Sequence, residues 1–393
     1  MSRVSPFAGL LFDATRTGPL DRVTAPPYDV ISPEDEARYR RASPFNIVRL
    51  VLTRDEPGDD GAEVKYARAG SLLSSWREGL VLVPDQVPAY YPYEMRFVLG
   101  GRPRRLRGLI CQVELEPWGG SIVPHEETMA GPVEDRLHLM RSTKANLSAI
   151  HAVFRGPCPG FGKLLHRVAG EAPIAEVHDE EGVEHRLWRL PETAKGAGEV
   201  AGWLEDEQLL IADGHHRYTM ALRYRNEIRS RYGAGPWDQV MMLVVPADQA
   251  PPVLPIHRIV LRGLVPIAGA RVRDLQEVLA QVSDDEVVYG TVALQEGELV
   301  HRVRALDGSP PTVCALHEQV LGGLDASRDL TFTADAVAAE TAVREGRAAG
   351  ALFLPPTTTA RIREVIERGG RLPQKSTYFW PKPRTGLVLR PLS

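Results

Sequence analysis

The chain has 393 residues, of which 43% are hydrophobic and 25% charged, and its formal net charge at pH 7 is −4. These values are ordinary for a folded globular protein. They give no overall positive field for nucleic acid or an anionic membrane, although a local basic groove is compatible with them. No apolar stretch approaches the roughly 20 residues that span a bilayer, and residues 1–13 lack the pattern of a signal peptide. Three cysteines, odd in number and far apart, predict no disulfide framework and a cytoplasmic location.

The predicted elements alternate between helices and strands along the whole chain. A stiff segment at 25–31, with two prolines, precedes a helix start at Ser32-Pro33-Glu34. The apolar run at 46–52 predicts a buried strand. The further elements are a helix over 62–78, a hairpin of strands 89–99 and 105–114, a helix from 131 toward 146, a strand over 209–212 with a helix after it, a strand over 241–245, a helix near 272–282, a helix over 334–347, a strand over 351–354 and a helix over 358–367. This interleaving predicts an α/β or α+β fold with a mixed sheet.

The domain organisation is predicted from where proline and glycine fall. They punctuate the chain without gathering into one linker, so we expect one globular unit over residues 1–393. A tentative subdivision separates a core over 1–262, an irregular insertion or subdomain over 263–325, and a C-terminal α/β segment over 326–393.

The most informative stretch of the sequence is LLIADGHHRY at 209–218. An apolar run, typical of a buried strand, ends in Asp-Gly, and two histidines and an arginine open a helix. Backbone N–H groups and the macrodipole at a helix N-terminus attract anions, so the junction suits a phosphate group, with the carboxylate available for a metal ion or a proton. The residues concerned are Asp213, Gly214, His215, His216 and Arg217.

Two simpler interpretations of this junction stay open. Asp213 could cap the helix while Gly214 makes the turn and the basic residues face solvent. A zinc site is the less favoured alternative, because adjacent helical residues such as His215 and His216 point about 100° apart and cannot easily share one metal ion.

Lysine usage marks a second segment. Of 47 basic residues only six are lysines, and two of them, Lys375 and Lys382, bracket the segment KSTYFWPK near the C-terminal end. Base composition that favours arginine codons explains the scarcity, but a lysine that persists in such a chain is a candidate for a role that needs a compact ammonium group. Chance placement on a tail is an equally good explanation.

Other candidate residues lie in or beside loops. His125-Glu126 precedes a predicted helix, and the glutamate could be a general base or a metal ligand, or simply part of a solvated acidic loop. Asp29 follows two prolines and Tyr28, which fixes a carboxylate on a rigid segment. Asp135-Arg136 lies on the next helix, and His257-Arg258 is a weaker candidate for an anion contact.

Several of these segments together resemble one family. They are 25–31, 46–50, His125-Glu126 with Thr128, 135–137, 212–218, and 375–382 with Gly386-Leu387. On them the chain is identified as a member of the domain-of-unknown-function 1015 family, from about residue 6 to the last few residues. The family commonly has an acidic residue where this chain has Thr219.

The Asp-Gly-His-His-Arg run also resembles free-serine kinases of the ParB/sulfiredoxin-like superfamily, and this implies a fold containing a ParB/sulfiredoxin-like nucleotide-binding core. It implies an ATP- and Mg²⁺-dependent kinase that makes O-phosphoserine from free L-serine. Asp213 would hold Mg²⁺, Gly214, His215 and Arg217 the phosphates, and His216 both a phosphate and the charge that develops in the transition state.

The resemblance also calls for a base, which cannot be placed by alignment because the spacing differs, and a zwitterionic substrate needs a cation for its carboxylate, which the sequence does not single out. Glu126 is the first choice for the base that deprotonates the serine hydroxyl, and also a candidate metal ligand; Asp29 is the second choice and a candidate substrate contact. Arg49, Arg136 or Lys375 would bind the substrate carboxylate, and Lys375 is also a candidate phosphate contact. The expected partners are a small molecule and a nucleotide, with no nucleic acid and no membrane.

Two other functions stay open from the sequence. One is hydrolysis of a nucleotide or phosphoester at the same residues, with water in place of the serine hydroxyl. The other is a non-catalytic module that responds to a nucleotide or DNA. The second would need a basic stripe or an added helix-turn-helix, and the sequence shows neither.

Overall fold

The computed structural model describes residues 4–126, 130–263, 265, 268–325 and 328–392. The chain forms two compact units. Unit 1 combines Met1–Pro124, Thr128–Ala250 and Pro381–Ser393, and unit 2 combines His125–Glu127 with Pro251–Trp380. Unit 2 is therefore an insertion in the sequence of unit 1. The boundaries expected after residues 262 and 325 both fall inside unit 2.

Unit 1 is built on a mixed sheet, and the predicted α/β class with a mixed sheet is confirmed. Among the described residues this sheet has ten strands, in the order β6-β12-β8-β13-β5-β4-β10-β9, with β1 beside β5 and β11 beside β4. The pairs β12–β6 and β13–β8 are parallel and the others antiparallel. The strands are β1 Val4–Ser5, β4 Ala89–Leu99, β5 Arg102–Glu114, β6 Ile122–Val123, β8 Ile150–Phe154, β9 Ala175–His178, β10 Glu184–Leu187, β11 Leu190–Pro191, β12 Leu209–Asp213 and β13 Gln239–Pro246. Two small pairs, β2 Leu10–Phe12 with β3 Leu82–Pro84 and β7 Ala145–Asn146 with β22 Arg390–Pro391, complete the unit's strands.

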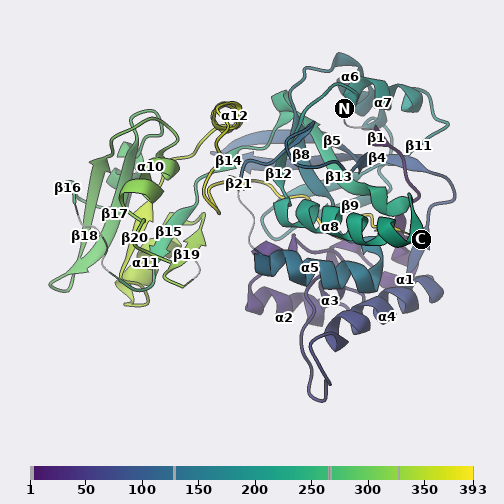
Figure 1. Cartoon of the computed structure of the whole chain (residues 1–393), viewed down its shortest axis with the longest axis horizontal. Helices are drawn as coiled ribbons and strands as arrows, with labels where there is room; N and C mark the ends of the chain where they lie inside the picture. Colours follow the sequence, from purple (N-terminus) through teal and green to yellow (C-terminus); the bar gives the residue numbers. More distant parts are fainter. Residues whose placement is uncertain (1–3, 127–129, 264, 266–267, 326–327, 393) are drawn as a thin grey trace. The chain divides into compact units, whose positions relative to one another are not determined.

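The helices of unit 1 lie in two groups (Figure 1). α5 packs between α4 and α8, and α3 contacts both α4 and α2. α6 and α7 contact each other, and they also contact β5 and β1 respectively. The helices are α1 Ala14–Thr17, α2 Pro33–Ala42, α3 Val48–Val51, α4 Val64–Glu78, α5 Ala130–Thr143, α6 Pro159–Val168, α7 Val200–Leu204 and α8 His215–Tyr232. Short 3₁₀ turns lie at η1 Leu20–Arg22, η2 Tyr28–Val30, η3 Ala197–Glu199, η4 Pro236–Asp238 and η5 Ala247–Gln249. The predicted helix start at Ser32 is confirmed, because its side chain accepts a hydrogen bond from the Asp35 N–H and Pro33 occupies the first turn.

The core of unit 1 follows from strands with apolar residues on both faces. All eight residues of β13 except the first are buried, and so are all five of β8 and of β12. Such strands lie centrally, covered by helices on both sides. A polar side chain at the end of one of these strands is therefore held by a rigid framework. Asp213, the last residue of β12, is such a side chain.

The segment 46–52 is not the strand that its composition predicts. It forms a turn and the short helix α3, because Asn46 fixes the local backbone: its Oδ1 accepts from the Val48 N–H at 2.9 Å, and its Nδ2 donates to the Arg22 carbonyl at 2.8 Å. Ile47, Val48 and Leu50 are all fully buried in the core of the helical layer. A continuous apolar run is compatible with either a buried strand or a buried helix, and here the asparagine decides.

Unit 2 contains a second sheet and three helices packed on it, with α12 beyond. Among the described residues its sheet has six strands in the order β16-β18-β17-β20-β15-β19. The elements are β14 Val253–Leu254, β15 His257–Val260, β16 Ala270–Val272, α9 Leu275–Gln281, β17 Val288–Gln295, β18 Glu298–Ala305, α10 Thr312–Gln319, β19 Leu330–Thr333, α11 Ala336–Arg344, β20 Gly350–Phe353, α12 Thr359–Glu367 and β21 Tyr378–Phe379. Its core contains the alanine-rich face of α11 and the strands beneath it.

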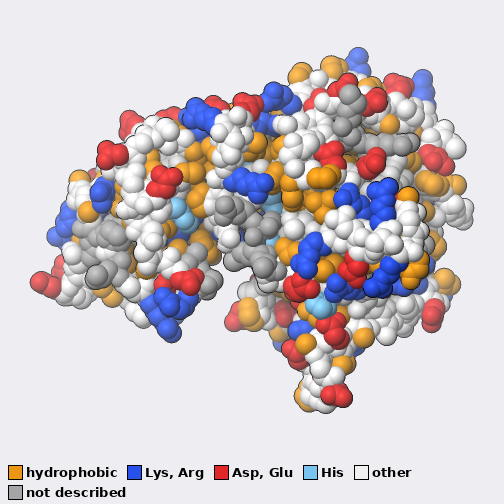
Figure 2. All heavy atoms as spheres, viewed as in Figure 1, with side chains coloured by type: hydrophobic (Ala, Val, Ile, Leu, Met, Phe, Trp, Pro, Cys, Tyr) orange, Lys and Arg blue, Asp and Glu red, His pale blue; other side chains and the backbone are white. Residues whose placement is uncertain are grey.

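The surface of unit 1 carries both signs of charge. On the face seen in Figure 2, basic and acidic side chains are interspersed over α5 and α8. Arg141 and Glu227 lie 2.8 Å apart there, as do Arg223 and Glu134. Within the described ranges no helix is both long enough and apolar enough to cross a membrane.

Candidate functional site

The junction between β12 and α8 depends on Gly214. Its φ of +103° lies in the region that favours glycine, and it is the N-cap of α8. A Cβ at this position would lie 3.0 Å from Nε of Arg217, so the absence of a side chain also lets that guanidinium fold back over the turn. The glycine thus allows Arg217, one turn into α8, to reach the carboxylate at the end of β12.

Asp213 is held by two cations. Its Oδ1 pairs with Nζ of Lys382 and its Oδ2 with a guanidinium nitrogen of Arg217. All three side chains are largely buried, with 9–10% of each exposed. Arg217 also donates to Oγ of Ser148 at 2.9 Å and to the Ala149 carbonyl at 2.7 Å. We call Asp213, Arg217 and Lys382 the junction cluster.

The charges of the junction cluster determine what it can bind. Burial alone would raise the pKa of Asp213, but the opposing charges of Lys382 and Arg217 outweigh burial and hold that pKa well below its usual range. One carboxylate against two cations leaves a net charge of about +1. The cluster thus places two cations and one carboxylate at a helix N-terminus, and Asp213 pairs with both cations and does not cap α8.

His151 lies directly beside the junction cluster. It pairs with Asp213 across the β8–β12 ladder, so both side chains project from the same face of the sheet. His151 is fully buried, and neither ring nitrogen has a hydrogen-bond partner among the described residues. Burial lowers its pKa to about 4, against the opposing effect of the Asp213 charge. The imidazole is thus neutral at neutral pH and adds no charge to the cluster.

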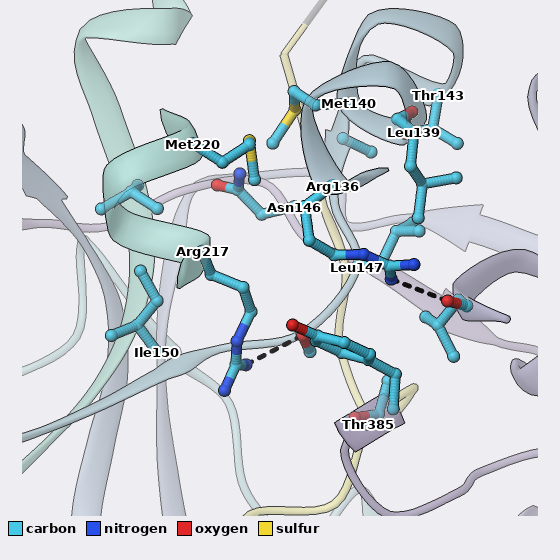
Figure 3. A pocket seen from close by; sticks show the side chains of 15 residues that line it. Arg136, Leu139, Met140, Thr143, Asn146, Leu147, Ile150, Arg217, Met220 and Thr385 are labelled. Carbon is cyan, nitrogen blue, oxygen red and sulfur yellow. Dashed lines mark hydrogen bonds between the residues drawn. The ribbon is translucent and has the colours of Figure 1, made fainter. Parts of the chain in front are cut away.

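A small cavity adjoins the junction cluster inside unit 1. Its volume is about 40 Å³, which suits a group of a few atoms such as a carboxylate rather than a whole nucleotide. Arg217 enters it from α8 and Arg136 from α5 (Figure 3). The Arg136 guanidinium lies 4.1 Å from the ring centre of Tyr28, which also lines the cavity. Arg136 donates to the Val51 carbonyl at 2.7 Å, so its position is fixed by α3.

The two histidines of the motif differ in burial. His215 is 8% exposed and stacks on Trp118 with 6.5 Å between ring centres, whereas His216 is half-buried. They lie on different sides of α8, as expected for adjacent helical residues.

Glu126 belongs to unit 2, where one carboxylate oxygen gathers three donors. Its Oε1 accepts from the N–H groups of Ser376 and Thr377 at 3.0 and 2.9 Å, and from the Thr377 hydroxyl at 2.7 Å. His125 Nε2 lies 2.7 Å from the same hydroxyl. His125 and Glu126 therefore contact Ser376 and Thr377 of the lysine-bracketed segment, whose residues 375–380 belong to unit 2 as well. Thr128 lies outside the described residues.

The other predicted contacts are not brought into the cavity. Asp29 is exposed on the turn after Tyr28. Arg49 lines a different cavity, beside Arg40 and Arg54. Lys375 is half-buried in unit 2 with φ +54°. Of the three cations expected to bind a substrate carboxylate, only Arg136 lines the cavity of Arg217.

Two members of the site were not in the predicted set. Lys382 carries a signal in the sequence, since it is one of the six lysines, but that signal does not distinguish it from Lys375 at the other end of the segment, which is the predicted residue. His151 lies in an apolar strand, and only the pairing of β8 with β12 brings it to Asp213.

The donor atoms of the junction cluster decide whether it could hold Mg²⁺. Both oxygens of Asp213 are occupied by cationic groups, so the carboxylate does not fit the expected role of an open Mg²⁺ ligand. Within the described ranges, one group of three side chains could hold a metal ion, Glu176, His178 and Glu184 on β9 and β10, and it includes neither Asp213 nor Glu126. Arginines pair with both of its glutamates.

The fold and this junction define a mixed α/β protein with a cationic strand–helix turn. The chain belongs to the family described as "Protein of unknown function (DUF1015)", whose model matches residues 4–321. The segment 375–382 thus lies beyond the matched range. No curated protein matches the chain in sequence.

Three solved structures illustrate what the fold is similar to. A conserved hypothetical protein from Pyrococcus furiosus is 13% identical, with a TM-score of 0.36, over 66% of this chain and 86% of that one. A free serine kinase in complex with AMP is 14% identical, with a TM-score of 0.34, over 66% and 83% of the two chains. SbnI with a C-terminal truncation, from Staphylococcus aureus, is 11% identical, with a TM-score of 0.37, over 69% and 84%. At these scores the likenesses carry no argument about chemistry.

Proposed function

We propose that the chain is an ATP-dependent kinase that phosphorylates the hydroxyl of free L-serine. The observation that supports this most is the junction cluster, in which two cations and one carboxylate lie at the N-terminus of α8. It is formed within the motif that resembles free-serine kinases. Phosphoryl transfer needs placement of the phosphates and neutralisation of their charge more than covalent help, and such a cluster supplies both.

In this proposal the junction cluster and the first turn of α8 bind the phosphates of ATP. Arg217 and Lys382 would neutralise phosphate oxygens, and the backbone N–H groups of the first turn of α8 would donate to them. Gly214 lets the Arg217 guanidinium fold back over the turn to the place where these phosphates would lie. We assign to His216 the stabilisation of charge on the transferred group, and to His215 a supporting phosphate contact.

In this proposal the adjoining cavity binds the carboxylate of free serine, the phosphoryl acceptor. A free amino acid presents a carboxylate, and Arg136 brings a buried guanidinium into this cavity. That guanidinium donates through one terminal nitrogen to the Val51 carbonyl, and its Nε and its other terminal nitrogen pair with Asp135. A guanidinium binds a planar carboxylate through two parallel hydrogen bonds, so the substrate carboxylate would take the place of Asp135 on Arg136. Such binding would orient the serine hydroxyl toward the phosphate held at the junction.

The reaction balances as follows. The serine Oγ forms a bond to the γ-phosphorus of ATP while the bond from that phosphorus to the β–γ bridging oxygen breaks. The hydroxyl proton passes to a carboxylate, and ADP leaves. Glu126 remains our first candidate for that base and Asp29 the second. The three donors on Oε1 of Glu126 fix the carboxylate's orientation, which a base requires. No step is assigned to Mg²⁺, because Asp213 is already engaged.

The test is an incubation of the full chain with ATP, Mg²⁺ and a pool of free amino acids, read by mass spectrometry. We expect O-phosphoserine and ADP in equal amounts. Lys382→Gln should abolish both, and Lys195→Gln, which removes an exposed lysine of the same unit, should leave both unchanged. ADP without a phosphorylated amino acid would indicate the hydrolase instead. If no ADP forms at all, the chain would be a non-catalytic binding module.

A binding measurement tests the role of Asp213 separately. Because its oxygens are paired with Lys382 and Arg217, ADP should bind nearly as well in EDTA as in Mg²⁺. A loss of ADP binding in EDTA would show that a metal ion holds the nucleotide. Asp213 would then again be the candidate Mg²⁺ ligand.

A further inference from the structure

A second cationic cavity lies in the helical layer of unit 1, away from the DGHHR motif. It has a volume of about 290 Å³ and is bounded by α2, α3, the turn after α3, and α4. It shares no lining residue with the cavity of Arg136. Its charged lining consists of Arg40, Arg49, Arg54, Lys65, Arg68 and Glu56.

Three of these five cations have carboxylate partners. Arg40 pairs with Glu36, Lys65 lies 3.4 Å from Asp55, and Arg68 pairs with Asp59. Glu56 lies 3.6 Å from Arg68. Three of the cavity's five positive charges are therefore balanced by carboxylates.

Arg49 and Arg54 are the exceptions. Neither has an ion pair with any described residue of the chain. Arg49 donates only to backbone carbonyls, to that of Arg40 at 2.6 Å and to that of Ser43 at 3.3 Å. Those two contacts hold its guanidinium in the cavity without neutralising it.

The field around Arg49 is repulsive. Burial lowers its pKa first, and the charges of Arg40 and Arg54 lower it further, against the weaker opposing effect of Glu56. Arg49 is half-buried and held by its two carbonyl contacts, whereas Arg54 is exposed where it lines the cavity. The repulsion between these like charges costs free energy, and a bound anion would remove that cost. The Thr53 hydroxyl beside them is buried and has no hydrogen-bond partner among the described residues, so a donor is also available.

We propose that this cavity binds a phosphate group, carried as inorganic phosphate or as a phosphomonoester. Two unpaired guanidinium groups match the charge of a phosphate dianion, and their forked donors match its oxygens. A monocarboxylate would neutralise only one of them. This inference stands apart from the proposed kinase, since it concerns different residues.

The cavity is connected to the site of Arg136 through two consecutive carbonyls. The Val51 carbonyl accepts from Arg136, and the Leu52 carbonyl accepts from Arg40. A phosphate that draws on Arg40 and Arg49 would therefore act on the same turn that fixes Arg136.

The test is calorimetric titration of the full chain with inorganic phosphate, and separately with O-phosphoserine, at constant ionic strength set by chloride. All proteins carry Lys382→Gln, so that phosphate bound at the junction cluster does not contribute. The test variant is Arg49→Gln with Arg54→Gln. Its matched control is Arg41→Gln with Arg77→Gln, which removes two exposed charges from α2 and α4 that do not line the cavity.

We expect one phosphate bound by the Lys382→Gln protein and by the control, and an affinity at least about tenfold lower in the test variant. Binding should slow hydrogen exchange over residues 49–54. Binding of inorganic phosphate and O-phosphoserine alike would define a site for the phosphate group itself, whereas binding of O-phosphoserine alone would define a phosphomonoester site. Equal weakening in the control and the test variant, or no binding of either ligand, would overturn the proposal.

Discussion

Replacement of Asp213 by Asn is the most direct test of the junction cluster. The substitution preserves the shape of the side chain and removes its charge. Lys382 and Arg217, each about 10% exposed, would then lie together without a counter-ion. Removal of one partner from a buried ion pair costs about 3–5 kcal/mol, because the remaining charge is uncompensated. We therefore expect Asp213→Asn to lower the free energy of unfolding of unit 1 by about that amount.

The assay is guanidinium unfolding followed by tryptophan fluorescence, which reports mainly on unit 1. Five of the six tryptophans belong to that unit, Trp76, Trp118, Trp188, Trp203 and Trp237, and Trp380 belongs to unit 2. Asp206→Asn, at an exposed position after α7, is the matched control and should change stability by less than about 0.5 kcal/mol. ADP should restore part of the loss, because the uncompensated cations attract an anion more strongly.

The pH dependence follows from the lowered pKa of Asp213. A depressed carboxyl pKa contributes stability above the ordinary value near about 4, and this contribution is lost only as the pH falls below it. The difference between wild type and Asp213→Asn should thus be equal at pH 8 and pH 6. A loss of less than about 1 kcal/mol at both pH values would refute the view that the carboxylate anchors the two cations.

Three further predictions concern single residues. Glu126→Gln should lower kcat at least about 100-fold while the affinity for ATP changes little, as expected for a base; a collapse of ATP binding in its place would exclude that role. Arg136→Gln should raise the KM for serine about tenfold or more, whereas Arg141→Gln on the same helix should not, and equal effects in steady-state kinetics would remove Arg136 from the substrate site. His151→Leu should lose less stability in acid than the wild type. Because the pKa of His151 in the folded state is about 4, the wild type's free energy of unfolding falls by about 3 kcal/mol between pH 6.5 and pH 4. A variant whose unfolding free energy depends on pH as the wild type's does would contradict a buried neutral imidazole.

The sequence predicts the junction well because its signals are local. The apolar run, the Asp-Gly pair and the helical spacing after it all lie within about one strand and one helix, where periodicity is informative. The predicted strand over 209–212 and the helix after it are confirmed as β12 and α8. The helix over 62–78 is confirmed in the same way as α4.

The partners of Asp213 could not be predicted by the same reasoning. Lys382 lies 169 positions away, and His151 reaches the site through strand pairing. Neither contact leaves a periodic pattern in the sequence. The division into two units leaves no local signal either, since the chain leaves unit 1 near Pro251 and returns near Pro381 without a long Pro- or Gly-rich linker at either point.

The order of synthesis gives the junction cluster a further property. Asp213 is made before the whole of residues 251–380, and Lys382 after them. A ribosome-bound chain that has completed β12 and α8 therefore carries the motif with Arg217 as the sole charged partner of Asp213 in the cluster. If the proposed function holds, a nascent or prematurely terminated chain would carry the complete DGHHR motif and yet transfer no phosphate, because the last cation arrives only after unit 2 has been made.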